Sequence, residues 1–455
     1  MTYHSHETAS TPMRPLLALA LAASLAACDT GGPPEPPGPP ADPALGAWLA
    51  ERAHPLDTAA PRDDVSDLRF LDDLVGDARV VALGEATHGT REFFQIKDRV
   101  VRYLVDELGF DALVFEADAA AGVALDRYVR GGTGDAADLL AGTRLWPWQT
   151  EEVAALVGGL RARNATGADV GFYGADVQFP ALQADLVAQA VRSAEPDSAA
   201  AVEEAYRCLV DLSQPTFEAR QAGVRAYPDR PAAEIARCRA RVQEVRAYLE
   251  RRSGPLGAAL GARGYAGVLD AAVAAEQGEL AWGSLNVRST NYSYFRDRAM
   301  ADNVLRVLDR LGEGGRVVVW AHNVHVSESV ADLPTMGEFL DEALGDRYRS
   351  VGFAFQRGAV QSVQIAGGLR PVEVGDGPAD GYGALLASAG LPLFALDLRG
   401  LDGPGAALAG PRPFRQYGAR VEPGPVGPAR LADWFDAVVF VETSTPSRPL
   451  AGAAR

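Results

Sequence analysis

Cysteine and histidine are scarce in this sequence. Of its 455 residues, three are cysteine and six are histidine. The cysteines, Cys28, Cys208 and Cys238, form no CxxC pair, so a structural zinc site of the usual spacing is not expected. Outside the cytoplasm, Cys208 and Cys238 could instead form one disulfide that closes a helical hairpin.

Long hydrophobic runs are missing beyond the N-terminus. Residues 14–28 read RPLLALALAASLAAC, an apolar stretch too short to span a bilayer stably and typical of a cleaved leader. LAAC resembles a bacterial lipobox, in which cleavage precedes the cysteine and a lipid is attached to its sulfur. We therefore expect a signal peptide over residues 1–27 and a lipidated Cys28. An ordinary secretory signal or a weak membrane anchor is the alternative.

A proline- and glycine-rich stretch follows the leader. Residues 29–43, DTGGPPEPPGPPADP, cannot pack into a core and predict an extended tether over residues 28–44. The folded domain would then occupy residues 45–455. These segments predict a lipoprotein of the bacterial cell envelope that faces the periplasm or the exterior and meets the membrane through its lipid alone.

Positive charge is in deficit, because the formal net charge is -17. Such a surface repels phosphate backbones and anionic headgroups, so nucleic acid is not an expected partner. A cationic or neutral small molecule remains compatible with this charge.

Short apolar or β-branched runs alternate with helical patterns along most of the chain. The expected strands are residues 79–84, 110–117, 168–176, 316–323, 347–355 and 436–443. Between the first two, an amphipathic stretch ends at Gly109, as a helix should, which completes a βαβ unit. The prediction is an α/β fold with a mainly parallel sheet flanked by helices. From about residue 180 to 285 no strand pattern occurs, which predicts a large α-helical insertion.

Polar residues with catalytic potential gather where the predicted strands end. They are Glu85, His88, Glu116, Asp176, His322 and His325. Ligands of open α/β sheets bind outside the carboxyl ends of the strands, so these residues should meet in one crevice. Three of the six histidines belong to this set.

Each of these residues also has a purely structural interpretation. Glu85 and Thr87 could cap the helix after Gly89, and Asp176 could cap the helix that follows it. Glu116 could pair with an arginine, and the two histidines of AHNVH could be solvated loop residues.

The residue types favour one kind of chemistry. The sequence has no G-x-S-x-G motif, and neither Cys208 nor Cys238 follows a predicted strand, so covalent catalysis by serine or cysteine is disfavoured. A histidine oriented by a carboxylate can deprotonate water directly, while a second histidine and a cation stabilise the oxyanion. The same side chains would also suit Zn²⁺, Mn²⁺ or Fe²⁺, so a metal-dependent hydrolase is the alternative.

At these positions the sequence resembles the erythromycin esterase family. The matching motifs are GEATHG (84–89), LVFEA (113–117) and AHNVH (321–325), with further likeness in LWPWQTEEV, FYGADVQ, RDRAMADNV and the closing FDAVVFVETSTPSRPL. The resemblance covers roughly residues 65–450. It implies hydrolysis of a macrolide lactone or a related ester without a serine nucleophile, and so a role in macrolide resistance. No cofactor is expected, with a divalent metal as the open alternative.

The resemblance also implies roles for individual residues. His88 is the expected base for water, Glu85 and Glu116 hold and polarise the catalytic groups, and His322 assists at the carbonyl. His325 and Asp176 are expected to support the substrate. Further substrate contacts are expected from Lys97, Arg298, Trp146 and Trp148, although the two tryptophans suit core packing equally well. Lys97 stands where the family often has arginine, which removes a planar, bidentate donor.

A third hypothesis is a tethered protein that binds a small molecule at this sheet edge without turning it over. The complete set of glutamates and histidines favours an enzyme over this alternative, because a binding site needs no base held by a carboxylate.

Overall fold

The computed structural model describes residues 43–209, 226–284, 289–330, 334–364, 368–421 and 426–453. The predicted leader, Cys28 and nearly all of the predicted tether lie outside these residues. Helix α1 (Pro43–Arg52) begins within the last two residues of the predicted tether. From Pro43 onward, the described residues belong to one compact unit.

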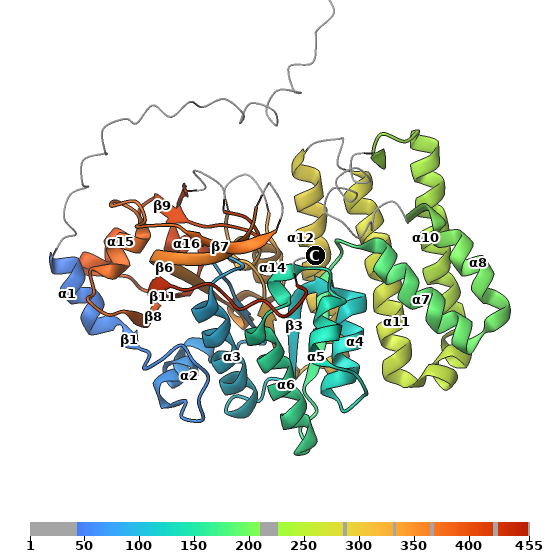
Figure 1. Ribbon diagram of the computed structural model, residues 1–455, viewed down its shortest axis with the longest axis horizontal. Coiled ribbons are helices and arrows are strands. Elements are labelled where there is room, and N and C mark those ends of the chain that lie inside the picture. Colours follow the sequence, from blue (N-terminus) through green and yellow to red (C-terminus); the bar gives the residue numbers. More distant parts are fainter. Residues whose placement is uncertain are drawn as a thin grey trace, which may run out of the picture. The chain divides into compact units, whose positions relative to one another are not determined.

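A mixed sheet of nine strands organises the described residues (Figure 1). Its order is β1-β8-β11-β6-β2-β5-β3-β4, with β7 paired to β6. Its strands are β1 (His54–Pro55), β2 (Val80–Leu83), β3 (Ala112–Asp118), β4 (Gly171–Asp176), β5 (Val317–Trp320), β6 (Tyr348–Val363), β7 (Leu369–Glu373), β8 (Leu393–Asp397) and β11 (Ala437–Ser444). A separate hairpin pairs β9 (Arg412–Arg415) with β10 (Val426–Ala429).

The central strands run parallel, as the sequence predicts. β2 pairs in parallel with β5 and β6, β3 with β5 and β4, and β11 with β6. β2 and β5 are buried at every position. Uninterrupted apolar strands of this kind are expected where helices cover both faces. The α/β prediction is therefore confirmed.

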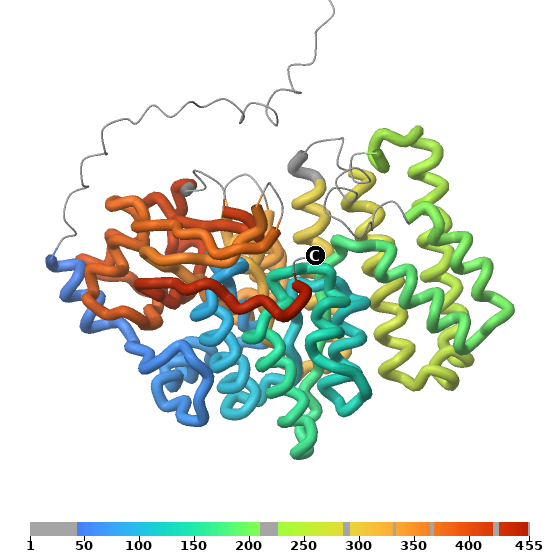
Figure 2. The backbone as a smooth tube through the Cα atoms, viewed as in Figure 1, coloured from blue at the N-terminus to red at the C-terminus, as the bar shows by residue number. Residues whose placement is uncertain are grey.

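Helices cover the sheet and extend to one side of it (Figures 1 and 2). Those of the sheet region are α2 (Phe70–Val75), α3 (Arg91–Asp106), α4 (Ala119–Val129), α5 (Ala136–Ala141), α6 (Glu151–Ala165), α12 (Ser289–Leu311), α13 (Asn323–Val326), α14 (Met336–Leu344), α15 (Tyr382–Ala387) and α16 (Leu431–Trp434). α3 and α6 pack into one apolar core on the sheet, whereas α12 and α14 contribute to a second core.

The predicted helical insertion is confirmed over its described residues. It contains α7 (Pro180–Ala194), α8 (Pro196–Tyr206), α10 (Ala232–Arg251) and α11 (Ser253–Gly283), and it has its own apolar core. A disulfide joins Cys208 to Cys238. This bond ties the segment after α8 to α10.

Several strands are absent from the sequence prediction. β8 and β1 add antiparallel strands at one edge of the sheet, and β6 continues to Val363, well past its predicted end. Edge strands of two to five residues carry too little alternation to stand out from loop sequence. The insertion, by contrast, lacks any strand pattern over about 100 residues, which is a stronger signal.

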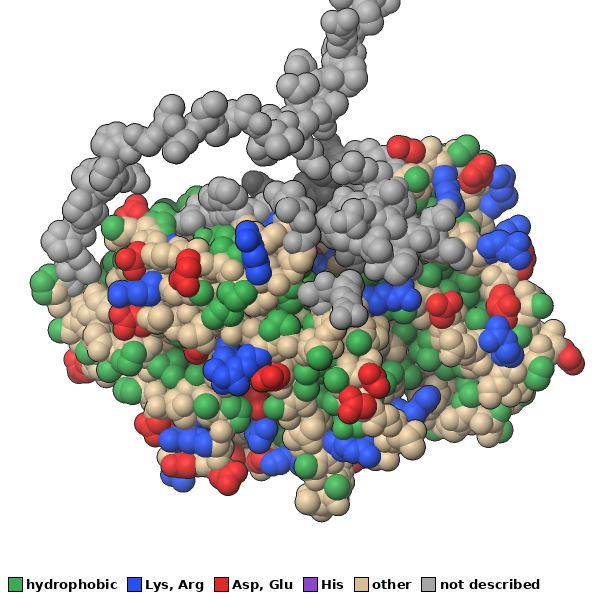
Figure 3. All heavy atoms as spheres, in the orientation of Figure 1, with side chains coloured by type: hydrophobic (Ala, Val, Ile, Leu, Met, Phe, Trp, Pro, Cys, Tyr) green, Lys and Arg blue, Asp and Glu red, His purple; other side chains and the backbone are tan. Residues whose placement is uncertain are grey.

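Charged side chains of both signs are interspersed on the molecular face shown in Figure 3. No helix among the described residues is long and apolar enough to cross a membrane.

Candidate active site

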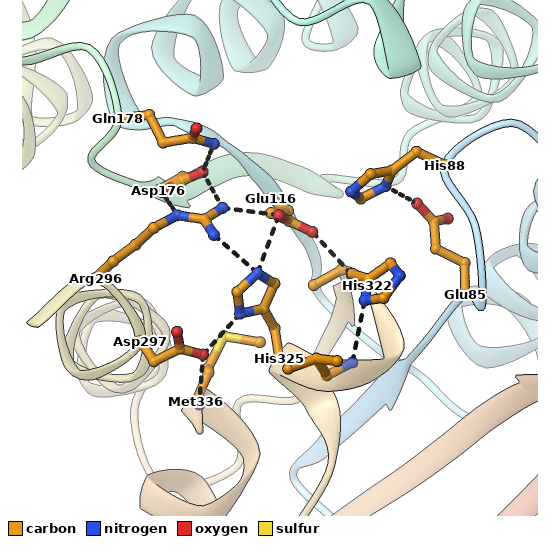
Figure 4. A network of polar contacts seen from close by, with 12 residues as sticks. Glu85, His88, Glu116, Asp176, Gln178, Arg296, Asp297, His322, His325 and Met336 are labelled. Atoms are coloured by element: carbon orange, nitrogen blue, oxygen red, sulfur yellow. Dashed lines mark hydrogen bonds and ion pairs between the residues drawn. The ribbon is translucent and has the colours of Figure 1, made fainter. Parts of the chain in front are cut away.

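Glu85 and His88 form a hydrogen-bonded pair directly after β2 (Figure 4). Nδ1 of His88 lies 2.6 Å from Oε1 of Glu85. With Nδ1–H donated to the carboxylate, Nε2 carries the basic lone pair. Nε2 has no hydrogen-bond partner within the described part of the chain. His88 is therefore held in the tautomer that a general base requires.

Two glycines allow the GEATHG loop to follow this path. A Cβ on Gly84 would lie 2.2 Å from Oδ1 of Asn323, and one on Gly89 would lie 1.9 Å from the backbone oxygen of Gln361. Asn323 in turn bonds the backbone of Phe353 through both ends of its amide. The loop after β2 is thus fixed against the loop after β5 and against β6.

The capping interpretation of this loop is wrong. α3 begins at Arg91, and its N-cap, Thr90, makes no capping side-chain bond. Thr87 accepts instead from the backbone N–H of Gly89, and Glu85 points to His88. The loop presents a side-chain pair and does not satisfy the helix terminus.

Lys97 holds the second oxygen of Glu85. Its Nζ donates to Oε2 at 2.6 Å, and neither side chain is exposed. Trp320 Nε1 also donates to Oε2 at 3.1 Å. Burial lowers the pKa of Lys97 to about 8, although Glu85 opposes that shift. The expected substrate contact by Lys97 is therefore corrected: this side chain lies behind Glu85, out of reach of solvent.

Glu116 connects the loop after β5 to α12. It lies in β3, where the register against β4 shifts after Phe115, and such irregularities redirect side chains. Its Oε2 accepts the backbone N–H of His322 at 2.8 Å, and its Oε1 accepts from Arg296 at 2.7 Å. Burial raises the pKa of Glu116, but the charges of His325 and Arg296 outweigh it and hold that pKa well below its usual range.

Arg296 is the central cation. Its Nε and Nη2 donate to both oxygens of Asp176, at 2.9 and 2.7 Å, and Nη2 also reaches Glu116. Burial opposes the charge of Arg296, yet Asp176, Glu116 and Tyr292 raise the pKa of the guanidinium further above its usual value. Gln178 Nε2 donates at 2.6 Å to Oδ2 of Asp176, the oxygen that also accepts from Arg296 Nη2. Arg296 thus fills the space between two carboxylates.

Two sequence-based expectations are corrected here. Asp176 caps no helix, because the N-cap of α7 is Phe179 and both Asp176 oxygens bind Arg296. Arg298 lies outside this network: its side chain is half exposed and pairs with Asp302 one turn further along α12.

His325 lies between two carboxylates. Its Nδ1 is 2.7 Å from Asp297, and its Nε2 is 3.4 Å from Glu116 and 2.8 Å from Arg296 Nη1. Burial lowers the pKa of His325, but Asp297 and Glu116 outweigh it and raise the pKa to about 10. A guanidinium only donates, so the short contact with Arg296 is a hydrogen bond only to a neutral ring. We favour the charged ring, because three carboxylates surround the two cations.

His322 is neutral and fully engaged. Its Nε2–H donates to the backbone oxygen of Tyr417 at 3.0 Å, and its Nδ1 accepts from the N–H of Val324 at 3.2 Å. Burial lowers its pKa to about 3. Its ring centre lies 5.1 Å from that of His88, so the two rings are neighbours. In this arrangement neither ring nitrogen is free for a substrate carbonyl, and the role of His322 in catalysis stays a prediction.

The two tryptophans differ in their surroundings. Trp148 is 1% exposed, donates to the backbone oxygen of Glu116 and packs edge-on against His88 and Phe115. Core packing against the base is therefore its role, and the expected substrate wall is corrected for this residue. Trp146 is partly exposed in the short 3-10 helix Trp146–Trp148, and its contact with a substrate stays a prediction.

Asp118 is a further buried carboxyl that the sequence did not single out. Oδ1 accepts from the backbone N–H of Phe179 and from Gln183, whereas Oδ2 has no partner among the described residues. Burial and the nearby charge of Asp176 raise the pKa of Asp118 well above its usual value. A neutral Asp118 leaves Asp176 free to pair with Arg296.

The side chains of the site do not form a metal-binding arrangement. Among the described residues no group of three or more histidine, cysteine, aspartate or glutamate side chains is arranged to hold an ion. Within the network, Arg296 lies between Asp176 and Glu116, where a cation would otherwise bridge the carboxylates. The residues present do not fit the metal-dependent alternative.

A separate surface hollow lies between β4, α4, α11 and α12. Its lining includes Arg263, Arg306 and Arg310, and none of the site residues described above contributes to it. Arg310 pairs with Asp270, and Arg263 pairs with Asp169. This hollow is therefore distinct from the Glu85–His88 pair.

Comparison with known proteins identifies the family. The sequence profile described as erythromycin esterase matches residues 105–444. The chain belongs to the erythromycin esterase family. It is 25% identical to an erythromycin esterase type II of Escherichia coli over 335 residues, which is 68% of this chain and 77% of that protein. It is also 25% identical to YbfO of Bacillus subtilis (strain 168) over 421 residues, 88% of this chain and 91% of the other.

A solved structure supports the fold of the family in this chain. An erythromycin esterase mutant in its open conformation superposes with a TM-score of 0.64 at 17% identity, over 84% of this chain and 95% of the other. At this identity the likeness concerns the fold alone. Family membership supports a hydrolase, while the arrangement of the site rests on the geometry above.

Sequence reasoning missed Arg296, although the family motif RDRAMADNV contains it. Helical phase carries the missing signal. Met300 and Val304 follow Arg296 at intervals of four and are buried, which puts Arg296 on the inner face of α12. Asp302 follows Arg298 by four residues and is exposed with it. Asp297 and Gln178 could not be placed without the structure.

Proposed function

We propose that this chain is a carboxylic ester hydrolase that cleaves an ester or a lactone with a water molecule activated by His88. One observation carries the proposal. The base and the two cationic side chains of the network are slightly exposed: His88 by 12%, Arg296 by 12% and His325 by 14%. The carboxylates that hold them are hidden behind, with Glu85 and Asp176 at 0% and Glu116 at 5%.

This arrangement, with the base and the cations exposed and the carboxylates buried, suits the transfer of an acyl group to water. When water attacks a carbonyl, negative charge develops on the carbonyl oxygen, and fixed positive groups stabilise it best where solvent is largely excluded. Arg296 and His325 supply such groups. A site designed to bind a cation would expose its carboxylates instead.

His88 is the proposed base. Its Nδ1–H is committed to Glu85, and Nε2 takes the proton of the attacking water, which then bonds to the carbonyl carbon. Glu85 stabilises the imidazolium that forms, and Lys97 and Trp320 hold Glu85 in place. The proton passes from Nε2 to the leaving alkoxide as the acyl–oxygen bond breaks, so an acid and an alcohol are released and His88 is neutral again.

The substrate class and the cellular setting are also proposals. We propose a lactone or ester of macrolide type, and with it a role in macrolide resistance, supported by the type II erythromycin esterase relative. We further propose that the mature protein begins at Cys28 and is lipid-anchored in the cell envelope. Radioactive palmitate should label the full chain and not its Cys28→Ala variant.

Mass spectrometry tests the proposed reaction. Purified protein and its His88→Ala variant are incubated with a panel of macrolides, simple lactones and simple esters, with and without a chelator. We expect at least one compound to gain the mass of one water in a reaction that needs His88 and survives chelation. Loss of that product on chelation would favour the metal-dependent hydrolase. Tight binding without product would favour a protein that only binds its ligand.

A further inference from the structure

Aromatic side chains flank Arg296 on the first turns of α12. On one side, Tyr292 packs against Trp282 of α11, with ring centres 4.1 Å apart. On another, Tyr294 packs against Phe339 of α14 at 5.7 Å. The two pairs lie on different faces of one helix, so a substitution of Tyr294 can serve as a control for a substitution of Tyr292.

Tyr292 shares a face with the catalytic network. It precedes Arg296 by four residues, and residues at this spacing are neighbours along one side of a helix. It is close enough to Arg296 to act on its charge. Unlike Trp148 and Trp320, which are at most 1% exposed, Tyr292 keeps part of its surface exposed. Tyr292 is therefore a partly exposed residue beside the cation of the site.

Trp282 fixes the position of that ring. Its Nε1 donates to the backbone oxygen of Gln178 at 3.2 Å, and the Gln178 side chain donates to Asp176 at 2.6 Å. Asp176 holds Arg296. The chain of contacts runs from α11 through the loop after β4 to α12. Tyr292 is thereby placed relative to the same guanidinium that faces the reacting group.

We infer that Tyr292 is a specificity-determining residue, whose ring packs against an apolar cyclic part of the substrate, and that Trp282 is the positioning residue behind it. The inference rests on the proposed hydrolysis. An aromatic ring offers a large, rigid apolar face at little entropic cost, which favours esters with a bulky hydrocarbon ring over small ones. The helical insertion thus takes part in substrate choice through α11.

Two esters without aromatic groups, one cyclic and one small, test this inference directly. Ethyl cyclohexanecarboxylate and ethyl acetate are hydrolysed separately in a pH-stat by the full chain and by its Tyr292→Leu, Trp282→Leu and Tyr294→Leu variants. For Tyr292→Leu we expect the ratio of kcat/KM for the cyclic ester over the acetate to fall several-fold, because leucine covers less of the hydrocarbon ring than tyrosine does. The change should appear in KM, and Trp282→Leu should shift the ratio in the same direction.

Tyr294→Leu is the matched control, because Tyr294 is 38% exposed and contacts none of the network residues through a described ring contact. An equal fall in Tyr294→Leu, or an unchanged ratio in Tyr292→Leu, would overturn the inference. If Trp282→Leu fails to fold, Trp282→Phe keeps a ring and should keep most of the preference.

A binding measurement separates this inference from the reaction itself. Calorimetric titration of ethyl cyclohexanecarboxylate into His88→Ala and into His88→Ala/Tyr292→Leu needs no turnover. Weaker binding in the double variant supports the role of Tyr292 even if neither ester is hydrolysed by the wild type, in which case the proposed function alone fails. Equal binding in both variants overturns the inference.

Discussion

Lys97 and Glu85 form a fully buried ion pair, with Nζ 2.6 Å from Oε2. The lysine ammonium also lies 4.4 Å from the ring centre of Trp320 and 5.6 Å from that of Phe353. The carboxylate that orients the base is thus neutralised from behind by a cation that the substrate cannot reach.

Lys97→Met should leave Glu85 buried without its cation. Breaking a buried pair costs about 3–5 kcal/mol, so the free energy of unfolding should fall by that order and kcat should fall with it. Lys97→Arg keeps the charge but crowds the rings of Trp320 and Phe353, at about 1–3 kcal/mol. Urea unfolding and steady-state kinetics of both variants check this. If Lys97→Met were as stable and active as wild type, the buried pair would have no role.

Arg296 and Arg298 provide a second matched test. Arg296→Met leaves Asp176 and Glu116 buried without their shared cation, and it should lower the free energy of unfolding by about 3 kcal/mol or more and abolish turnover. Arg298→Met breaks only an exposed pair, so the expected change is within about 1 kcal/mol. Thermal unfolding and kinetics of the two variants should separate them clearly. Similar effects at both positions would contradict the assignment of the cation.

His325 should give the protein a specific pH dependence. Its pKa is raised to about 10 in the fold from an ordinary value of 6.5, so its charge stabilises the folded state fully below pH 6.5. That stabilisation is lost as pH rises from 6.5 through 10. The difference in unfolding free energy between wild type and His325→Asn should therefore be largest near pH 6 and shrink towards pH 10. A constant difference across this range would show that the ring is not charged in the fold.

Asp118 should behave in an unusual way for a buried carboxyl. Its pKa is raised in the fold. As pH rises above the ordinary value of 3.8, the unfolded chain therefore loses this proton first, and the free energy of unfolding falls. Asp118→Asn keeps an acceptor for Phe179 and Gln183 and carries no such cost. Melting temperatures should show the variant gaining on wild type between pH 4.5 and pH 8. A constant difference between the variant and wild type over this interval would indicate that Asp118 is already charged in the fold.

The sequence predicted the fold where its physical signal is strong. Buried parallel strands leave apolar runs, which is why β2, β3, β4, β5 and β11 were located to within a few residues. Their order in the sheet explains why Glu85, Glu116, Asp176, His322 and His325 meet, since β2, β5, β3 and β4 are neighbours. Short edge strands such as β1 and β8 leave no comparable pattern.

The sequence predicted most of the residues that form the site, but not which of them contact one another. Polar residues at strand ends identified His88 and Glu116, but only contacts between elements show that Lys97 pairs with Glu85 and Arg296 with Glu116. Lys97 was expected at the substrate and lies behind Glu85, because α3 packs against the sheet with that face inward. Arg298 was predicted to contact the substrate, but it lies on the exposed face of α12, whereas Arg296 lies on the inner face with Met300 and Val304.

The role of His88 is the central claim, and kcat/KM of the His88→Ala variant on the substrate found by mass spectrometry tests it most directly. His88→Ala removes one partner of the buried Glu85 and a contact with Trp148, but Lys97 and Trp320 still hold Glu85, so the variant should fold with only a modest fall in melting temperature. We predict a loss of roughly 10² to 10⁴ in kcat/KM, the range that general base catalysis contributes. A folded His88→Ala protein with wild-type kcat/KM would contradict the account.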